Sequence, residues 1–166
     1  MNTKDHYILA KEISGSLKSF GGKLKRLAFI AGCIAPDMNP FTYIKGHRFN
    51  DRCQSLKMIL KSGKISVYNT GVIIHYIGDC FTFTHNSGFK GSLNEHIEYE
   101  NHLHTFINRD FRRFAGKIHI PENISLPELF QKLHDEYLRN KSSCENDCRY
   151  IYTVCTEITA RLTKAI

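Results

Sequence analysis

A histidine and an aspartate lie inside an otherwise apolar stretch of the chain, GVIIHYIGDCFTF, at residues 71–83. The two residues, His75 and Asp79, are four positions apart, so on a helix they share one face about one turn apart. A helix this apolar is expected to be buried, and a buried histidine and carboxylate must be paired or metal-bound to offset lost hydration. The fold must therefore bring polar partners to this helix face.

A second pair with the same spacing, His96 and Glu100, follows after a short loop. Ser92 and Glu95 precede it as S-x-x-E, a capping-box sequence that predicts the start of a helix. His85 stands between the two pairs. Histidine and carboxylate are ligand types of zinc and similar divalent ions. Together these residues predict a metal cluster built across neighbouring helices.

Chance accounts for part of this pattern. With 9 histidines and 16 acidic residues among 166, the composition predicts about one His-x-x-x-Asp/Glu pair at random. The chain has three such pairs, because His47 and Asp51 form another. Any one pair on an exposed helix would contribute only about 0.2–0.5 kcal/mol, and this alternative stays open for each pair taken alone. The order of the pairs and the apolar setting of the first favour the metal site.

Three more donors precede the cluster, namely His6, Asp37 and His47. Asp37 and His47 fall within residues 35–50, APDMNPFTYIKGHRFN, whose prolines and glycine predict a loop. Loops on a rigid scaffold commonly carry chemistry. As alternatives, Asp37 could be a turn or cap residue and His47 an exposed loop residue.

Helical periodicity extends over nearly the whole chain, with few alternating strand patterns. The first helix would begin at Thr3 or Asp5, the second would end before Pro36, and Ser125 would cap a later one. Short connections predict a compact all-α fold, and a chain of 166 residues fits one domain, 1–166. The expected helices cover about 4–18, 23–33, 50–62, 66–83, 93–114, 126–139 and 146–164.

The net charge of +7 favours anionic partners such as phosphate esters, anionic lipid surfaces or nucleic acid. No run approaches the roughly 18 uninterrupted apolar residues that a membrane span requires. The first residues, MNTKDHYILAKEI, contain no long apolar stretch of the signal-peptide kind, which predicts a cytoplasmic protein. The six cysteines are accordingly expected to be free thiols.

Some cysteines and histidines fall outside the main pattern. Cys144 and Cys148 form C-x-x-x-C without a second pair, which favours a loop or helix-start pair over a structural zinc site. His134 is expected on the surface. His104, two turns beyond His96, is expected to be exposed or at the core edge, or else to orient a ligand.

Read in order, the donors resemble those of the zinc-dependent phospholipase C family, which includes bacterial phosphatidylcholine-hydrolysing enzymes and clostridial alpha-toxins. The resemblance covers about residues 6–100 and rests on order and spacing rather than on any one motif. P1/S1-type nucleases share the all-α fold and a similar three-metal arrangement, so the resemblance alone does not decide the substrate. The matching residues are His6, Pro36-Asp37, His47, His75 with Asp79, His85, and His96 with Glu100.

This resemblance implies zinc as the cofactor. Two zinc sites and an additional third site are implied. The first site would use Asp37, His47, His75 and Asp79, and the second would use His85, His96 and Glu100. In the third, His6 and a bridging Asp79 would join the amine and carbonyl of the mature N-terminus. Only five residues precede His6, fewer than in secreted members, so Thr3, Asp5 or water are alternatives to that N-terminal pair.

The implied activity is that of a zinc-dependent phosphodiester hydrolase, phospholipase C-like, which cleaves a phospholipid headgroup or a related phosphodiester with a zinc-activated water. Asp37 is the implied general base as well as an implied ligand. Transient contact with a membrane surface would accompany a phospholipid substrate. The alternatives are a nuclease or phosphatase on the same scaffold, which would bring in nucleic acid as a partner, and a non-catalytic metal-binding domain.

Overall fold

A computed structural model describes residues 1–38, 56, 65–116 and 118–164 of the chain. Within these ranges the fold is all-α and contains no strand, which confirms the predicted fold class. The α-helices are α1 (Thr3–Ser16), α2 (Lys23–Met38), α5 (Val67–Cys80), α6 (Leu93–Asp110), α7 (Leu126–Arg139) and α8 (Cys144–Thr163). Three short 3-10 helices accompany them: η1 (Lys18–Phe20), η2 (Phe83–His85) and η3 (Phe111–Phe114).

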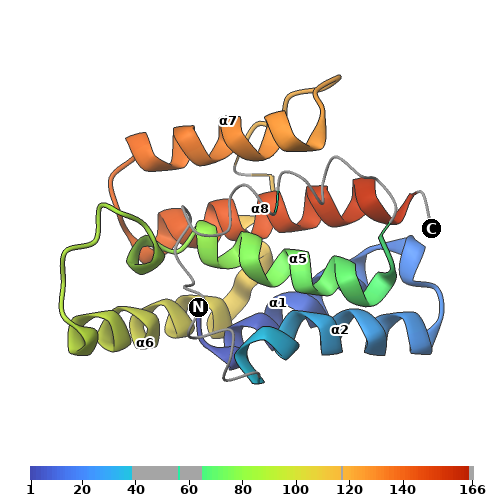
Figure 1. Cartoon of the computed structure of the whole chain (residues 1–166), viewed down its shortest axis with the longest axis horizontal. Helices are drawn as coiled ribbons and strands as arrows, with labels where there is room; N and C mark the ends of the chain where they lie inside the picture. The colour runs from blue at the N-terminus through green and yellow to red at the C-terminus, as the bar shows by residue number, and fades with distance from the viewer. Residues whose placement is uncertain (39–55, 57–64, 117, 165–166) are drawn as a thin grey trace.

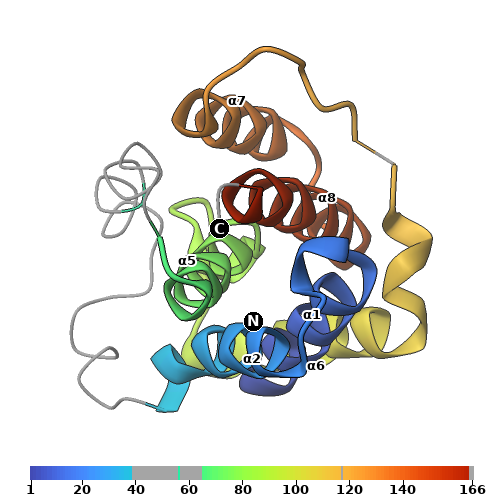
Figure 2. The ribbon, with the colours of Figure 1, turned by 90° about the vertical axis from the view of Figure 1, so that its right-hand side faces the viewer.

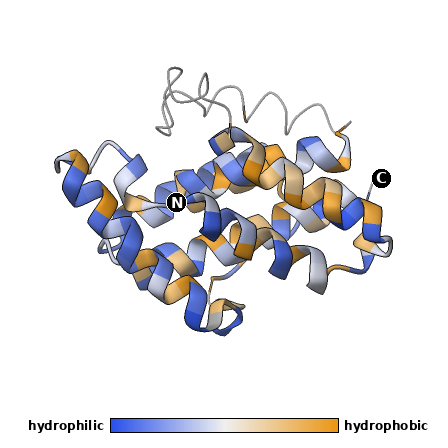
Figure 3. Cartoon of the chain, turned by 90° about the horizontal axis from the view of Figure 1, so that it is seen from below, coloured by the Kyte–Doolittle hydropathy of each residue, from blue (hydrophilic) through white to orange (hydrophobic). Residues whose placement is uncertain are grey.

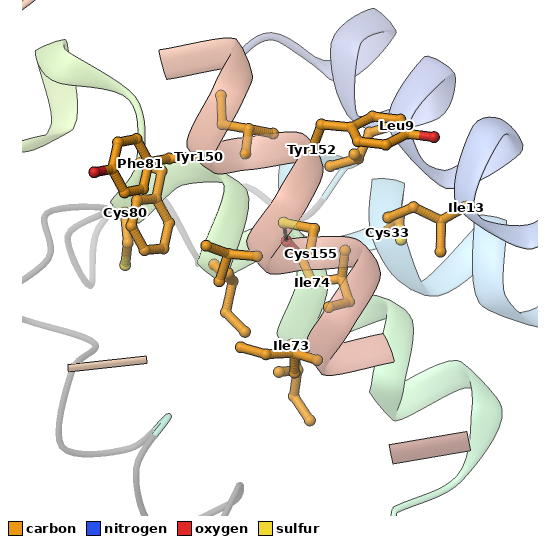
Figure 4. Close-up of a cluster of buried hydrophobic side chains, with 14 of the residues drawn as sticks. Leu9, Ile13, Cys33, Ile73, Ile74, Cys80, Phe81, Tyr150, Tyr152 and Cys155 are labelled. Atoms are coloured by element: carbon orange, nitrogen blue, oxygen red, sulfur yellow. Dashed lines mark hydrogen bonds between the residues drawn. The ribbon is translucent and has the colours of Figure 1, made fainter. Parts of the chain in front are cut away.

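Helix α8 runs through the middle of the fold and packs against α1, α5, α6 and α7 (Figure 1). Seen end-on, α7 lies on the opposite side of α8 from α1 and α2 (Figure 2). Apolar side chains of α5 and α8, among them Ile74 and Cys155, meet in the core shown in Figure 4. Figure 3 shows hydrophilic and hydrophobic residues around the same helices, as expected for amphipathic helices that bury one side.

Helices α2 and α5 approach each other at two glycines. A Cβ atom on Gly32 would lie 2.1 Å from the carbonyl oxygen of Tyr68, and one on Gly71 would lie 2.2 Å from that of Phe29. No larger residue fits at either position without moving a helix backbone. This contact holds the last turn of α2, which carries Asp37, beside the polar face of α5.

The boundary predicted for the second helix was wrong. Helix α2 continues through Pro36 to Met38, so Asp37 is helical rather than part of a loop. Pro36 lies in the last turn, where its missing N–H removes one hydrogen bond without ending the helix. The predicted helix at 50–62 and the donor His47 lie outside the described residues.

The other expected helices are present with shifted ends. Helix α5 ends at Cys80, earlier than the predicted end near residue 83, and a separate short helix, η2, carries His85. The capping box at Ser92 and Glu95 is confirmed at the start of α6. Helix α1 begins with Asn2 as its cap, because Asn2 and Asp5 form a reciprocal capping box that the sequence prediction missed.

Candidate metal centre

Asp79 lies at the centre of the predicted donors, in the last turn of α5, and is 2% exposed. Its Oδ1 atom is 3.2 Å from Nε2 of His6. Its Oδ2 atom is 3.5 Å from Nε2 of His75 and 3.9 Å from Nδ1 of His85. Burial by itself raises the pKa of Asp79, but the N-terminal amine and these imidazoles outweigh it and hold the pKa well below 3.8. One carboxylate therefore faces imidazoles from three segments of the chain.

The orientation of His75 is fixed from behind. Its Nδ1–H donates to the carbonyl oxygen of Cys33 at 2.9 Å, which leaves the lone pair of Nε2 directed toward Asp79 and Asp37. Nε2 is buried and has no hydrogen-bond partner among the described residues. Burial, together with the neighbouring His6, lowers the pKa of His75 to about 3. The imidazole is therefore neutral, which is the form that binds a metal ion.

Asp37 faces the same point from the end of α2. Its Oδ1 atom is 3.6 Å from Nε2 of His75. Its Oδ2 atom is buried without a hydrogen-bond partner in the part of the chain that the structure describes. Burial raises the pKa of Asp37, attraction to His75 opposes that rise, and repulsion from Asp79 adds to it. His47, the fourth donor predicted for this site, lies outside the described residues.

The second predicted group also comes together. Oε1 of Glu100 lies 3.1 Å from Nε2 of His85 and 3.2 Å from Nε2 of His96. Helix α6 supplies His96 and Glu100 from successive turns, and η2 supplies His85. Burial opposes the charge on Glu100, but hydrogen bonds from His85 and His96 outweigh burial and lower the pKa of this carboxyl. One donor atom from each of the three residues lies within 4.8 Å of the others.

The α-amino group of Met1 lies between the two groups. Its nitrogen is 3.1 Å from Oδ1 of Asp79, 2.9 Å from Oε1 of Glu100 and 3.2 Å from Nε2 of His85. Burial disfavours the charged amine, but attraction to Asp79 and Glu100 prevails and raises its pKa to about 11. The Asn2 capping box folds the chain so that Met1 reaches the site. The family resemblance implied the amine of a mature N-terminus beside His6 and Asp79, and the amine of Met1 lies next to Asp79. The Asn2-x-x-Asp5 capping box that brings it there was missed.

Asp5 does not replace the N-terminal ligand pair, contrary to one predicted alternative. Its Oδ1 atom accepts a hydrogen bond from Nδ1 of His104 at 2.6 Å, and its Oδ2 atom accepts from the backbone N–H of Asn2 at 3.4 Å. The carboxylate is therefore committed to holding the start of α1 against α6. His104 was predicted to be exposed or at the core edge, or else to orient a ligand. It lies at the core edge, where it supports the N-terminal turn through Asp5.

Zinc suits the donors that meet here. Two donors each about 2.1 Å from a tetrahedral ion lie roughly 3.4 Å apart, and zinc prefers imidazole nitrogen and carboxylate oxygen. The distances from the Asp79 oxygens to the three imidazole nitrogens, 3.2 to 3.9 Å, bracket that value. Nε2 of His75 and Oδ2 of Asp37, which have no hydrogen-bond partner among the described residues, are atoms that an ion would satisfy. The donor set in the described residues comprises His6, Asp37, His75, Asp79, His85, His96 and Glu100.

Five of these donors line a cavity of about 590 Å³, namely Asp37, Asp79, His85, His96 and Glu100. Asp37, Asp79 and Glu100 contribute to its polar side. Leu93 and Ile97, in the first turns of α6, line it as well and are 74% and 49% exposed. A cleft of this size that combines apolar walls with a few convergent polar groups is typical of a small-molecule site.

The family described as zinc-dependent phospholipase C matches residues 5–153 of the chain. The chain belongs to this family. No curated protein and no solved structure gives a significant match. Membership in the zinc-dependent phospholipase C family implies a metal-dependent phosphodiesterase with zinc as cofactor and a phospholipid-type substrate. In the described part of this phospholipase C family member, no helix has the length and hydropathy needed to cross a bilayer.

The structure thus brings together every predicted donor that it describes, in the two groups around Asp79 and Glu100. The individual roles of these residues as zinc ligands stay predictions. Sequence reasoning missed Leu93 and Ile97, and it considered the N-terminal amine only as an implication of the family resemblance. The two apolar residues could have been found, because they lie on the same face of α6 as His96 and Glu100 at spacings of three and four.

Proposed function

We propose that this protein hydrolyses the headgroup phosphodiester of a phospholipid, using zinc held by the two donor groups. The observation that supports this most directly is that both groups reach one cavity that also has an aliphatic rim. Asp79 of the first group lines it together with Asp37, and so do all three members of the second group. The first ion would be held by Asp37, His47, His75 and Asp79. The second would be held by His85, His96 and Glu100. A third would be held by His6, Asp79 and the amine of Met1, which must release its extra proton to bind the ion.

Zinc, when bound, would supply positive charge to the phosphate oxygens and lower the pKa of a water molecule. The chain contributes the remaining functions. Asp37 is the proposed general base, since its Oδ2 atom is directed to the site without a hydrogen-bond partner among the described residues and can accept a proton there. Asp79 would hold the first and third sites at a constant distance from each other, because its two oxygens face different imidazoles.

The aliphatic rim favours an amphiphilic substrate. Leu93 and Ile97 continue outward from His96 and Glu100 on the same helix face, so a diester bound at the polar end would place one of its substituents against them. An acylglycerol that packs there removes apolar surface from water, which favours binding by about 25 cal/mol per Å² buried. A nucleotide, being polar and charged, gains less from the same wall.

Three substrates tested side by side with added zinc would test this function: phosphatidylcholine in mixed micelles, bis-p-nitrophenyl phosphate and single-stranded DNA. We expect turnover of the first two. Asp37→Asn should abolish turnover of both while leaving bound zinc measurable. Cleavage of DNA with lipid left untouched would show a nuclease, and a zinc-loaded protein inert on all three would show a non-catalytic metal domain.

The rim has a matched control on α7. Ile97 and Leu138 are 49% and 50% exposed, and only Ile97 lines the cavity. Ile97→Ser should raise KM for micellar phosphatidylcholine several-fold and leave bis-p-nitrophenyl phosphate hydrolysis nearly unchanged. Leu138→Ser should alter neither. Equal effects of Ile97→Ser on the lipid and the soluble diester would contradict a lipid-binding role for the rim.

A further inference from the structure

A second buried carboxylate, Asp147 in the first turn of α8, lies behind the metal centre and is 0% exposed. Its Oδ2 atom accepts hydrogen bonds from the backbone N–H of Phe83 and from the hydroxyl of Tyr99, both at 2.9 Å. Its Oδ1 atom accepts from the hydroxyl of Tyr137, also at 2.9 Å. The amino-terminal end of α8 adds favourable charge for an anion at this position.

Two of these three partners lie next to the second donor group. Phe83 begins η2, the turn that ends at His85. Tyr99 directly precedes Glu100 on α6. Asp147 therefore links the two backbone segments whose side chains, His85 and Glu100, meet at 3.1 Å.

The same turn is held at its other end by His134, which was wrongly predicted to lie on the surface and is 1% exposed. Nε2–H of His134 is directed to the carbonyl oxygen of Cys80 at 3.1 Å and to Oδ1 of Asn86 at 3.0 Å. The amide of Asn86 in turn donates to the carbonyl oxygens of Cys80 and Thr82. These bonds join the segment to α7 through His134, and Asp147 adds a second connection by bonding both Phe83, in the segment, and Tyr99, on α6.

We propose that Asp147 is a positioning residue for the second metal group, acting through Phe83 and Tyr99 to set His85 opposite Glu100. The inference rests on the proposed zinc binding of that group. A carboxylate suits this role because it accepts several bonds at once, and bonds to an ionised acceptor are stronger than neutral ones. An apolar residue at 147 could fill the space but would leave the N–H of Phe83 unpaired in the interior.

The test measures zinc affinity rather than activity. Metal-free protein is titrated with zinc in competition with a chromophoric chelator at pH 7, and His85→Ala identifies the binding step that belongs to the second group. Asp147→Ala should weaken that step by about 10–100-fold, the usual effect of losing a residue that orients a metal ligand, and leave the other zinc binding unchanged. Asp147→Asn should restore most of the affinity, because an amide oxygen can still accept from Phe83.

Tyr99→Phe serves if Asp147→Ala does not fold, and Tyr150→Phe is its control. Tyr150 is itself buried, and its hydroxyl donates to the half-buried Glu136 at 2.8 Å, a similar hydrogen bond between α8 and α7 that involves none of the metal donors. Tyr99→Phe should weaken the second-group step several-fold, and Tyr150→Phe should leave it unchanged. If neither Asp147 variant nor Tyr99→Phe differs from Tyr150→Phe, Asp147 has a purely structural role. If the unaltered protein binds no zinc, the proposed function itself fails.

Discussion

Asp79 and Asp147 are both buried aspartates, 2% and 0% exposed, yet their surroundings differ in kind. Asp79 faces imidazoles and the N-terminal amine, all of which can carry positive charge or bind a cation. Asp147 faces a backbone N–H and two tyrosine hydroxyls, which are neutral donors. Burial alone does not distinguish the two carboxylates. Their hydrogen-bond and charge partners do, because only the partners of Asp79 suit a metal ligand, whereas those of Asp147 hold it as a fixed anchor.

The protonation behaviour of the two residues reflects these partners. The amine and the histidines overcome burial at Asp79 and hold its pKa well below 3.8. At Asp147 burial dominates, and the hydrogen bonds from Phe83, Tyr99 and Tyr137 oppose it only in part, so its pKa rises to about 6. A buried carboxylate that stays ionised at low pH can bind a cation over a wide pH range. For a carboxylate that titrates near pH 6, the charged form is maintained at neutral pH with the help of its hydrogen bonds.

The largest expected contrast is in activity. Asp79→Asn should lower kcat/KM for bis-p-nitrophenyl phosphate by roughly 10³-fold or more, the scale of removing an electrostatic group from an active site. Asp147→Asn keeps the shape and one acceptor oxygen, so we expect a loss of about 10-fold or less. Both variants are assayed at saturating zinc. Equal losses would remove the distinction between ligand and anchor.

The second-largest contrast is expected in the effect of metal removal on thermal stability. Zinc at about 1,000 times its Kd stabilises a folded protein by about 4 kcal/mol, which for a chain of this size corresponds to a Tm change on the order of 10 °C. Calorimetry with and without a chelator should show that difference in the unaltered protein and in Asp147→Asn. In Asp79→Asn it should shrink to a few degrees. A full zinc effect in Asp79→Asn would exclude this carboxylate as a ligand.

The pH dependence of stability should reveal Asp147. Because its pKa is raised from 3.8 to about 6, the folded state binds this proton more tightly than the unfolded state does. The contribution of Asp147 to the free energy of unfolding therefore falls as pH rises from about 4 to about 6. The total loss is roughly 3 kcal/mol, and it is complete above that range. Relative to the unaltered protein, Asp147→Asn should gain stability between pH 4.5 and 7.5 in urea unfolding. A constant difference across this range would show that Asp147 does not titrate there.

The sequence predicted Asp79 far better than Asp147. His75 and Asp79 interrupt an apolar stretch, so their burial and need for partners are visible in one segment. Asp147 lies in the polar stretch KSSCENDC, which resembles an exposed helix start. Its partners Phe83, Tyr99 and Tyr137 come from other segments, and hydroxyl and backbone donors leave no spacing signal.

The close contact of α2 and α5 was likewise hidden from the sequence. Gly32 and Gly71 are isolated glycines within helical patterns, and nothing in either segment pairs one with the other. The clash that a Cβ atom would meet at each becomes evident only with both helices in place. Local patterns thus predicted the helices and the donor types, while the contacts that set their distances arise between segments distant in the chain.

The smallest expected effect compares two tyrosines. The hydroxyl of Tyr137 donates to Asp147 at 2.9 Å, and that of Tyr150 donates to Glu136 at 2.8 Å. Tyr137→Phe should cost about 1.5–3 kcal/mol at pH 7.5, since it leaves a buried charged acceptor short of a donor, whereas Tyr150→Phe should cost about 0.5–1.5 kcal/mol because water can reach the half-buried Glu136.

Lowering the pH should change only one of these costs. At pH 5 Asp147 is largely protonated, because its pKa is about 6, and the loss of a donor from Tyr137 then matters less. Urea unfolding at both pH values should therefore show a smaller penalty for Tyr137→Phe at pH 5 and a nearly constant one for Tyr150→Phe. A penalty for Tyr137→Phe that does not vary with pH would mean that Asp147 keeps one charge state throughout. Its hydrogen bonds would then not depend on ionisation, and the contrast with Asp79 would rest on geometry alone.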